Sequence, residues 1–158
     1  MQKLSKKTEG FTDSVIRRMT RIAHKYDSIN LSQGFPDFAP PEMLMNRLRE
    51  TADISGVHQY SITFGARDLR HALAEKQSRF MGIDIDPETE ITITCGSTEA
   101  MMSSVLTVAD PGDKVIIFSP FYENYGADTI LSGAEPIYVP LVPPDFHFDP
   151  EVLEEKSG

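Results

Sequence analysis

The residues best suited to chemistry in this chain are Gly96, Ser97 and Thr98, which follow a β-branched run at residues 91–94 and open a predicted helix. The first N–H groups of a helix have no partner inside the helix, and the aligned peptide dipoles add partial positive charge there. Such a turn can hold a phosphate without a lysine or an arginine. The patterns of a P-loop and of a dinucleotide-binding turn are both absent. We therefore predict an anion site here; the alternative is that the three residues only cap the helix.

A pair of aromatic residues forms the second candidate for chemistry. Tyr122 comes shortly after the next predicted strand, and Tyr125 lies three residues further on. An aromatic ring at the end of a strand could cover the face of a flat cofactor. The alternative is that both tyrosines are core residues at the start of a helix.

The elements that would position these groups alternate between strand and helix. Such alternation is typical of an α/β protein with a mostly parallel sheet, whose ligands gather at the carboxyl ends of the strands. Both candidate sites lie at such ends. The strands are predicted over residues 90–94, 114–118 and 135–139, and the helices over 97–109 and 122–131, the second stopped by Gly133.

The N-terminal part of the chain is predicted to be helical with one interruption. Apolar residues at steps of three and four indicate a helix over residues 15–26, which Thr12 or Asp13 could cap. Glycine and proline exclude a regular helix over residues 29–41. Further helices are predicted over residues 42–50, from residue 65 to a left-handed cap at Gly82, and over 151–156.

Composition limits the classes of function. The 158 residues include 15 Lys+Arg and 24 Asp+Glu, and the net charge of -9 argues against a nucleic-acid or anionic-membrane partner. The single cysteine, Cys95, excludes an intrachain disulfide, and neither a membrane span nor a signal peptide is recognisable. We therefore expect a cytoplasmic protein that acts on small molecules.

The remaining titratable residues give no sign of a metal site or an acid–base pair. The four histidines have no metal-ligand spacing with Cys95 or with a pair of carboxylates, so we predict no metal. Asp84, Asp86, Glu88 and Glu90 are interpreted as a solvated loop.

Five segments, which occur in one order with regular gaps, carry a family resemblance. They are 31–38 (LSQGFPDF), 60–70 (Tyr, then Gly, then Leu-Arg), 94–100 (TCGSTEA), 110–115 (DPGDKV) and 120–125 (PFYENY). With these segments the chain resembles the class I/II pyridoxal-phosphate aminotransferases of fold type I, especially the branch of kynurenine, methionine and aromatic aminotransferases. The resemblance covers residues 11–158.

The resemblance implies roles for the candidate residues in binding pyridoxal 5'-phosphate. Gly96, Ser97 and Thr98 would hold the phosphate, Tyr122 would stack on the pyridine ring, and Tyr125 would lie near the pyridine nitrogen.

Three further residues receive roles from the resemblance alone. Tyr60 would reach the cofactor phosphate of the neighbouring subunit, which implies a homodimer with shared active sites. The main chain at Gly34 would approach the substrate carboxylate, and Ile16 would line the substrate pocket. On their own residue types, Tyr60 could be an ordinary tyrosine, Gly34 a turn and Ile16 a core residue.

The resemblance also implies an incomplete fold. Residues 1–45 would form the N-terminal arm and a segment of the small domain, and residues 46–158 the first part of the cofactor-binding large domain. The family's Schiff-base lysine lies beyond the corresponding segments: only Lys6 directly follows a serine, and Lys114 opens a strand. We therefore expect no catalytic residue among these 158 and no activity from them alone.

The expected function of the whole protein is transfer of an amino group from an amino acid to a 2-oxo acid by a ping-pong mechanism. One alternative is another fold type I enzyme, such as a lyase or a 1-aminocyclopropane-carboxylate synthase. The other is a non-catalytic fragment that serves in dimerisation or as a scaffold.

Overall fold

The computed structural model describes residues 4–11 and 13–158, and it divides into two compact units. One unit comprises residues 1–22 and 95–158, and the other comprises residues 23–94. The expected division into residues 1–45 and 46–158 concerns the domains of a whole protein and stays a prediction.

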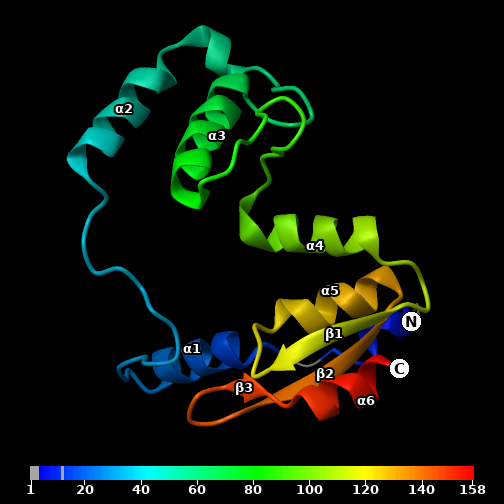
Figure 1. Cartoon of the computed structure of the whole chain (residues 1–158). Coiled ribbons are helices and arrows are strands. Elements are labelled where there is room, and N and C mark those ends of the chain that lie inside the picture. Colours follow the sequence, from blue (N-terminus) through cyan, green and yellow to red (C-terminus); the bar gives the residue numbers. More distant parts are fainter. Residues whose placement is uncertain (1–3, 12) are drawn as a thin grey trace. The chain divides into compact units, whose positions relative to one another are not determined.

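The first unit is built on a small sheet (Figure 1). Strands β1 (Lys114–Ser119) and β2 (Glu135–Val142) are parallel, with Lys114 opposite Glu135. Ile117 and Val139, from the middle of these strands, are buried. The two predicted parallel strands are thus confirmed. A short strand that was not predicted, β3 (His147–Phe148), pairs antiparallel with the end of β2.

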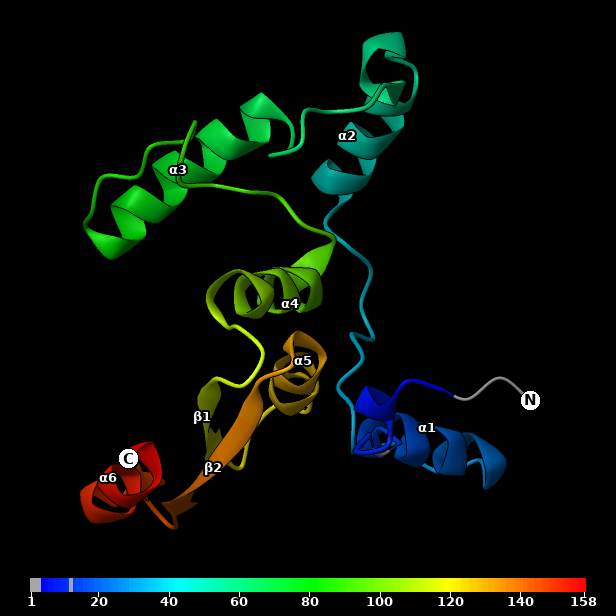
Figure 2. The same ribbon diagram turned by 90° about the vertical axis from the view of Figure 1, so that its right-hand side faces the viewer.

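Helices cover both faces of this sheet. Helix α5 (Asn124–Ser132) lies between helix α4 (Gly96–Val108) and the two parallel strands, while α6 (Pro150–Ser157) lies on the other side against β2 (Figure 2). Helix α5 begins two residues later than predicted, so Tyr122 belongs to the loop before it. The other predicted helices of this part are confirmed, and Gly133 ends α5 in the left-handed conformation.

The N-terminal segment contains the short 3-10 helix η1 (Lys6–Thr8) and helix α1 (Val15–Lys25), which belongs to the first unit up to Ile22. The α1 prediction is confirmed, but its cap is Ser14, whose Oγ accepts from the N–H of Arg17 at 3.3 Å. Asp13 instead pairs with Arg21, and Thr12 lies outside the described residues. A serine directly before the helix satisfies the N–H of the third helical residue better than a residue one position earlier.

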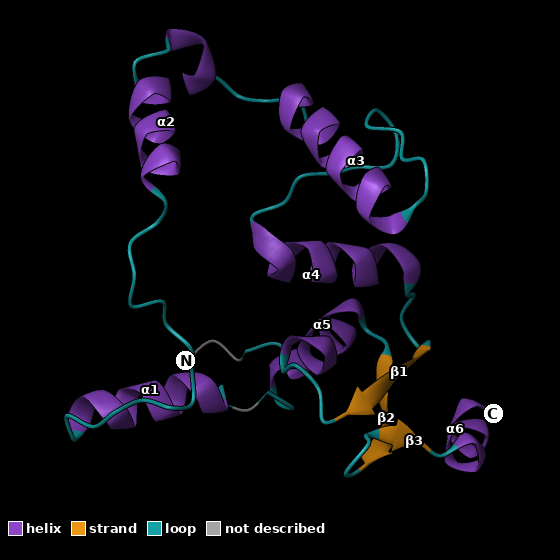
Figure 3. Cartoon of the chain, turned by 60° about the vertical axis from the view of Figure 1, so that its left-hand side comes forward, coloured by secondary structure: helices purple, strands orange, loops and turns teal. Residues whose placement is uncertain are grey.

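The second unit is helical (Figure 3). It contains α2 (Glu42–Ala52), the 3-10 helix η2 (Ser55–His58) and α3 (Arg67–Met81), which ends at left-handed Gly82 as predicted. Residues 29–41 have no regular structure, which is also as predicted.

The predicted strand over residues 90–94 is wrong, because no strand is formed there. The N–H of Ile93 donates to the carbonyl of Phe64 at 3.0 Å, but no ladder of hydrogen bonds follows. A β-branched run becomes a strand only when a neighbouring strand pairs with it. Among the residues that the structure describes, this run has no such neighbour.

Within the described part of the chain, no helix has the length and apolar character needed to cross a lipid bilayer.

Candidate functional site

The turn at residues 96–98 is open and forms the first turn of α4. Gly96 has a φ of +84°, which favours glycine, and a Cβ placed there would meet nothing within 4 Å. Ser97 and Thr98 are exposed. The Glu99 carboxylate accepts a hydrogen bond from the N–H of Cys95, the residue directly before the helix. The predicted anion site therefore has accessible hydroxyl groups at a helix N-terminus.

The start of α5 adjoins this turn through one side-chain hydrogen bond. Asn124 Nδ2 donates to Thr98 Oγ1 at 3.2 Å. Asn124 is half-buried, and it lies two residues after Tyr122. The bond therefore ties the loop that carries the aromatic candidate to the anion-binding turn.

The two tyrosines contact each other edge to face. Their ring centroids are 6.0 Å apart with an interplanar angle of 77°, and the N–H of Tyr125 donates to the carbonyl of Tyr122. Tyr122 is 51% exposed, so much of its ring is accessible to a flat ligand. Tyr125 is more covered, and it contributes to an apolar cavity of about 300 Å³ between α4, α5 and β1.

The other three predicted residues are not part of this group. Ile16 is half-buried in α1 of the same unit. Gly34 and Tyr60 belong to the second unit, where Gly34 is exposed and Tyr60 is 97% exposed. The structure thus brings together residues 96–98, Tyr122 and Tyr125, and leaves the roles of the other three as predictions.

Comparisons with known proteins identify the family of the chain. The profile of the family described as "Aminotransferase class I and II" matches residues 26–157. The chain belongs to this aminotransferase family. Since the match covers most of the chain, it includes both the turn at 96–98 and the tyrosine segment.

Individual aminotransferases match over most of the chain. A probable N-succinyldiaminopimelate aminotransferase from Mycobacterium tuberculosis is 40% identical over 134 residues, which are 84% of this chain and 33% of the relative. A methionine aminotransferase from Escherichia coli is 38% identical over 86% of this chain and 35% of the relative. The chain thus spans about a third of the length of these curated relatives.

A solved structure supports the fold. The N-succinyldiaminopimelate aminotransferase of Mycobacterium tuberculosis superposes with a TM-score of 0.86 at 33% identity. The superposition covers 98% of this chain and 40% of that one. The expected fold class, an α/β protein that is part of a fold type I aminotransferase, is therefore confirmed.

In this aminotransferase chain, sequence reasoning missed the residues that hold the start of α5. Ser14 Oγ donates to Glu123 Oε1 at 2.7 Å, and Phe121 stacks on Tyr138 of β2 at a centroid distance of 5.0 Å. These side chains border a cavity of about 490 Å³, which Arg17 also lines. No local pattern indicates these contacts, because the partners come from distant parts of the sequence.

A second cluster that the sequence did not indicate surrounds Glu88. Arg70 is 1% exposed; its guanidinium donates to Glu88 Oε2 at 3.1 Å, to the carbonyl of Gly65 at 3.4 Å and to the carbonyl of Pro87. Arg67 and His71 contact Glu88 at 3.2 and 2.8 Å. Hydrogen bonds from His71, Arg70 and Arg67 lower the pKa of Glu88 to about 2.

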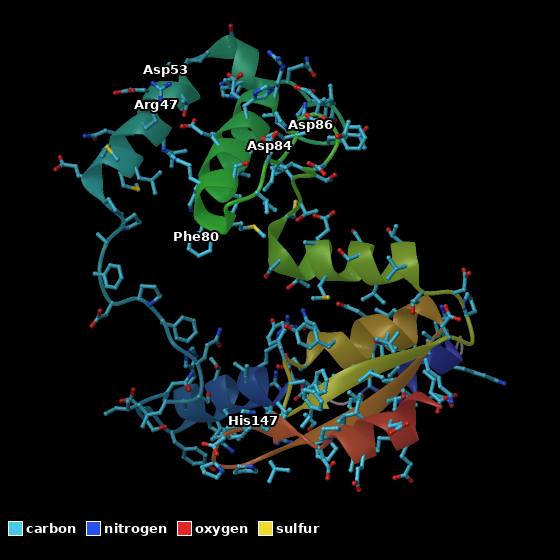
Figure 4. All side chains as sticks on the ribbon, in the orientation of Figure 1. Arg47, Asp53, Phe80, Asp84, Asp86 and His147 are labelled. Carbon is cyan, nitrogen blue, oxygen red and sulfur yellow. The ribbon has the colours of Figure 1, made fainter. Side chains whose placement is uncertain are left out.

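All four acids lie on an exposed loop, as predicted, but the sequence did not indicate that Glu88 pairs with three basic side chains. Asp86, on the same loop, has its pKa lowered by hydrogen bonds from the Glu88 N–H and the Thr89 hydroxyl. Figure 4 shows Asp84 and Asp86 on the loop that follows α3. No group of metal-binding residues occurs in the described ranges 4–11 and 13–158.

Asp128 is a buried acid in α5. It is 5% exposed, its Oδ2 has no hydrogen-bond partner, and burial raises its pKa. An unpaired carboxylate in this position favours the protonated form.

Proposed function

We propose that the whole protein to which these residues belong is a pyridoxal-phosphate-dependent aminotransferase. It transfers an amino group from an amino acid to a 2-oxo acid by a ping-pong mechanism. The observation that carries the proposal is the hydrogen bond between Asn124 and Thr98, which joins the open turn to the tyrosine segment in a chain of this family.

The residues present fit pyridoxal 5'-phosphate. The open space around Gly96 and the exposed hydroxyl groups of Ser97 and Thr98 suit a phosphate, and the half-exposed ring of Tyr122 suits a pyridine ring. Tyr125, which contacts Tyr122 edge to face, would limit how far the ring of Tyr122 can tilt. When bound, the cofactor supplies an electron sink for the carbanion formed at the substrate Cα.

The roles of the remaining predicted residues belong to the same proposal. Exposed Tyr60 would reach the cofactor phosphate of a neighbouring subunit in a homodimer with shared sites, Gly34 would approach the substrate carboxylate, and Ile16 would line the pocket. The exposure of Tyr60 supports this role, because an exposed tyrosine side chain is accessible to a partner subunit. A cytoplasmic location and the domain division at residue 45 also stay predictions.

Residues 1–158 alone are proposed to have no transaminase turnover. The support is the context of the lysines: Lys6 lies in the N-terminal arm and Lys114 opens β1, so neither stands in the family's Schiff-base context. Without such a lysine, proton movement at the substrate Cα has no general base.

Spectroscopy and product analysis on the whole purified protein test the proposal. We expect an absorbance band of bound pyridoxal phosphate that shifts when an amino acid is added. Methionine and N-succinyldiaminopimelate are the first donors to test, because relatives of this chain carry those names. No band and no shift would contradict cofactor binding. Ammonia release without amino transfer to a 2-oxo acid would favour a lyase, and oxo-acid formation by residues 1–158 alone would contradict the predicted inactivity.

A further inference from the structure

We propose that Asn124 is a positioning residue for the cofactor phosphate: its side-chain amide orients the Thr98 hydroxyl so that the hydroxyl proton is donated to a phosphate oxygen. This inference rests on the proposed function.

The direction of the hydrogen bond carries the argument. Asn124 Nδ2 can only donate, so the Thr98 oxygen must accept. A threonine hydroxyl that accepts from an amide keeps its own proton for another acceptor. Because Thr98 is exposed in the first turn of α4, an anion at that turn can receive this proton. Hydrogen bonds in such a chain polarise one another, which strengthens the bond to the anion.

The segment that carries Asn124 is held in place before any ligand binds. The residue before it, Glu123, accepts a 2.7 Å hydrogen bond from Ser14, and Phe121 stacks on Tyr138. Asn124 is itself half-buried. A group fixed in this way loses little conformational freedom when the phosphate arrives, so more of the interaction contributes to affinity.

An aspartate at the same position reverses the hydrogen bond. A carboxylate has nearly the same shape as the amide but only accepts, so it would take the Thr98 proton away from the phosphate. It would also add a negative charge beside an anion site. Asn124→Asp is therefore expected to harm phosphate binding more than Asn124→Ala, although it changes the shape less.

Titration of the whole apo-protein with pyridoxal phosphate and, separately, with pyridoxal tests this proposal. We expect Asn124→Ala to raise the Kd for pyridoxal phosphate about five-fold, and Asn124→Asp to raise it more than about twenty-fold. Pyridoxal has no phosphate, so its Kd should stay the same. In a Thr98→Val background, Asn124→Ala should have no further effect. Asn46→Asp makes the same chemical change on exposed α2 and serves as the control.

The outcomes separate this proposal from the proposed function. If the unaltered protein does not bind pyridoxal phosphate, the proposed function fails. If it binds normally and both Asn124 variants bind it equally well, Asn124 has no positioning role. If both variants weaken pyridoxal and pyridoxal phosphate to the same extent, or if Asn124→Asp binds pyridoxal phosphate as tightly as the unaltered protein, the proposal is overturned. The bond would then only join α5 to α4.

Discussion

The hydroxyl of Ser14 donates a 2.7 Å hydrogen bond to Glu123, although 109 positions separate the two residues in the sequence. The same oxygen accepts from the N–H of Arg17 and so caps α1. One hydroxyl therefore fixes the start of the helix that carries Ile16 and joins it to the residue after Tyr122. The N-terminal segment is further attached to α5 where Lys7 donates to the carbonyl of Leu131 at 2.7 Å.

Replacing Ser14 by alanine removes both the cap and the bond to Glu123. We expect Ser14→Ala to lower the free energy of unfolding by about 1–2 kcal/mol, because the variant loses both a helix cap and a hydrogen bond and each loss is destabilising. Ser14→Thr keeps the hydroxyl and should restore most of the loss. Ser157→Ala, at an exposed helix end, is the control. Equal thermal midpoints for Ser14→Ala and Ser157→Ala would show that the hydrogen bonds of the Ser14 hydroxyl do not stabilise the fold.

Arg70 is the buried basic group of the second unit, and its replacement should be costly. Arg70→Ala leaves the carbonyl groups of Gly65 and Pro87 without their donor, so we expect a loss of about 3 kcal/mol in chemical denaturation. Arg70→Lys should recover less than half of the stability lost in Arg70→Ala, because a lysine side chain lacks the planar guanidinium that donates to three acceptors. The matched control is Arg79→Lys, an exposed residue paired with Glu75 on the same helix. A mild effect of Arg70→Lys would contradict this account.

The pH dependence of stability should report on Glu88. Its pKa in the folded protein, about 2, lies below the ordinary value of 4.5. The folded state therefore binds this proton less readily than the unfolded state, and the stabilisation from Glu88 is complete above pH 4.5. That stabilisation is lost as the pH falls from about 4.5 towards 2. Glu88→Gln should accordingly be less stable than the unaltered protein at pH 6, with a difference that shrinks on acidification. Urea denaturation at several pH values measures this difference, and a constant difference would refute the assignment.

How much of the fold can be predicted from the sequence depends on whether an element is stabilised by local or by long-range interactions. Helix α3 and its cap at Gly82 follow from local periodicity and from one glycine, and both are as expected. Residues 91–94 have the composition of a strand but form none, because a strand depends on a neighbour that composition does not reveal.

The candidate site divides in the same way. The turn at residues 96–98 and the position of Tyr122 are recognisable from short motifs. The bonds from Asn124 to Thr98 and from Ser14 to Glu123 join residues 26 and 109 positions apart, and a single sequence gives no signal for such pairs. The ion pairs of Glu88 are not recognisable for a related reason, since its partner Arg70 looks like a surface residue until the fold buries it.

Gly65 is a position where only glycine fits. Its φ is +99°, and a Cβ placed there would lie 2.5 Å from the Cβ and Cγ1 of Ile93. Gly65→Ala should therefore lower the free energy of unfolding by about 2 kcal/mol or more, through both strain and a clash. Gly56→Ala is the control, because nothing lies within 4 Å of its Cβ position. Comparable thermal midpoints for the two variants would mean that Ile93 does not pack on Gly65.

Asp128 should destabilise the protein at neutral pH, because burial raises the pKa of its carboxyl group and Oδ2 has no partner. For an acid whose folded pKa is raised, the destabilisation is absent below the unfolded pKa and grows as the pH rises through that value. We expect Asp128→Asn, which stays neutral, to be more stable than the unaltered protein at pH 7 and to lose most of that advantage at pH 3. Asp84→Asn, on the exposed loop after α3, is the control and should show no such dependence. If Asp128→Asn is instead less stable at pH 7, the carboxylate has a cationic partner elsewhere in the whole protein, and the raised pKa does not hold there.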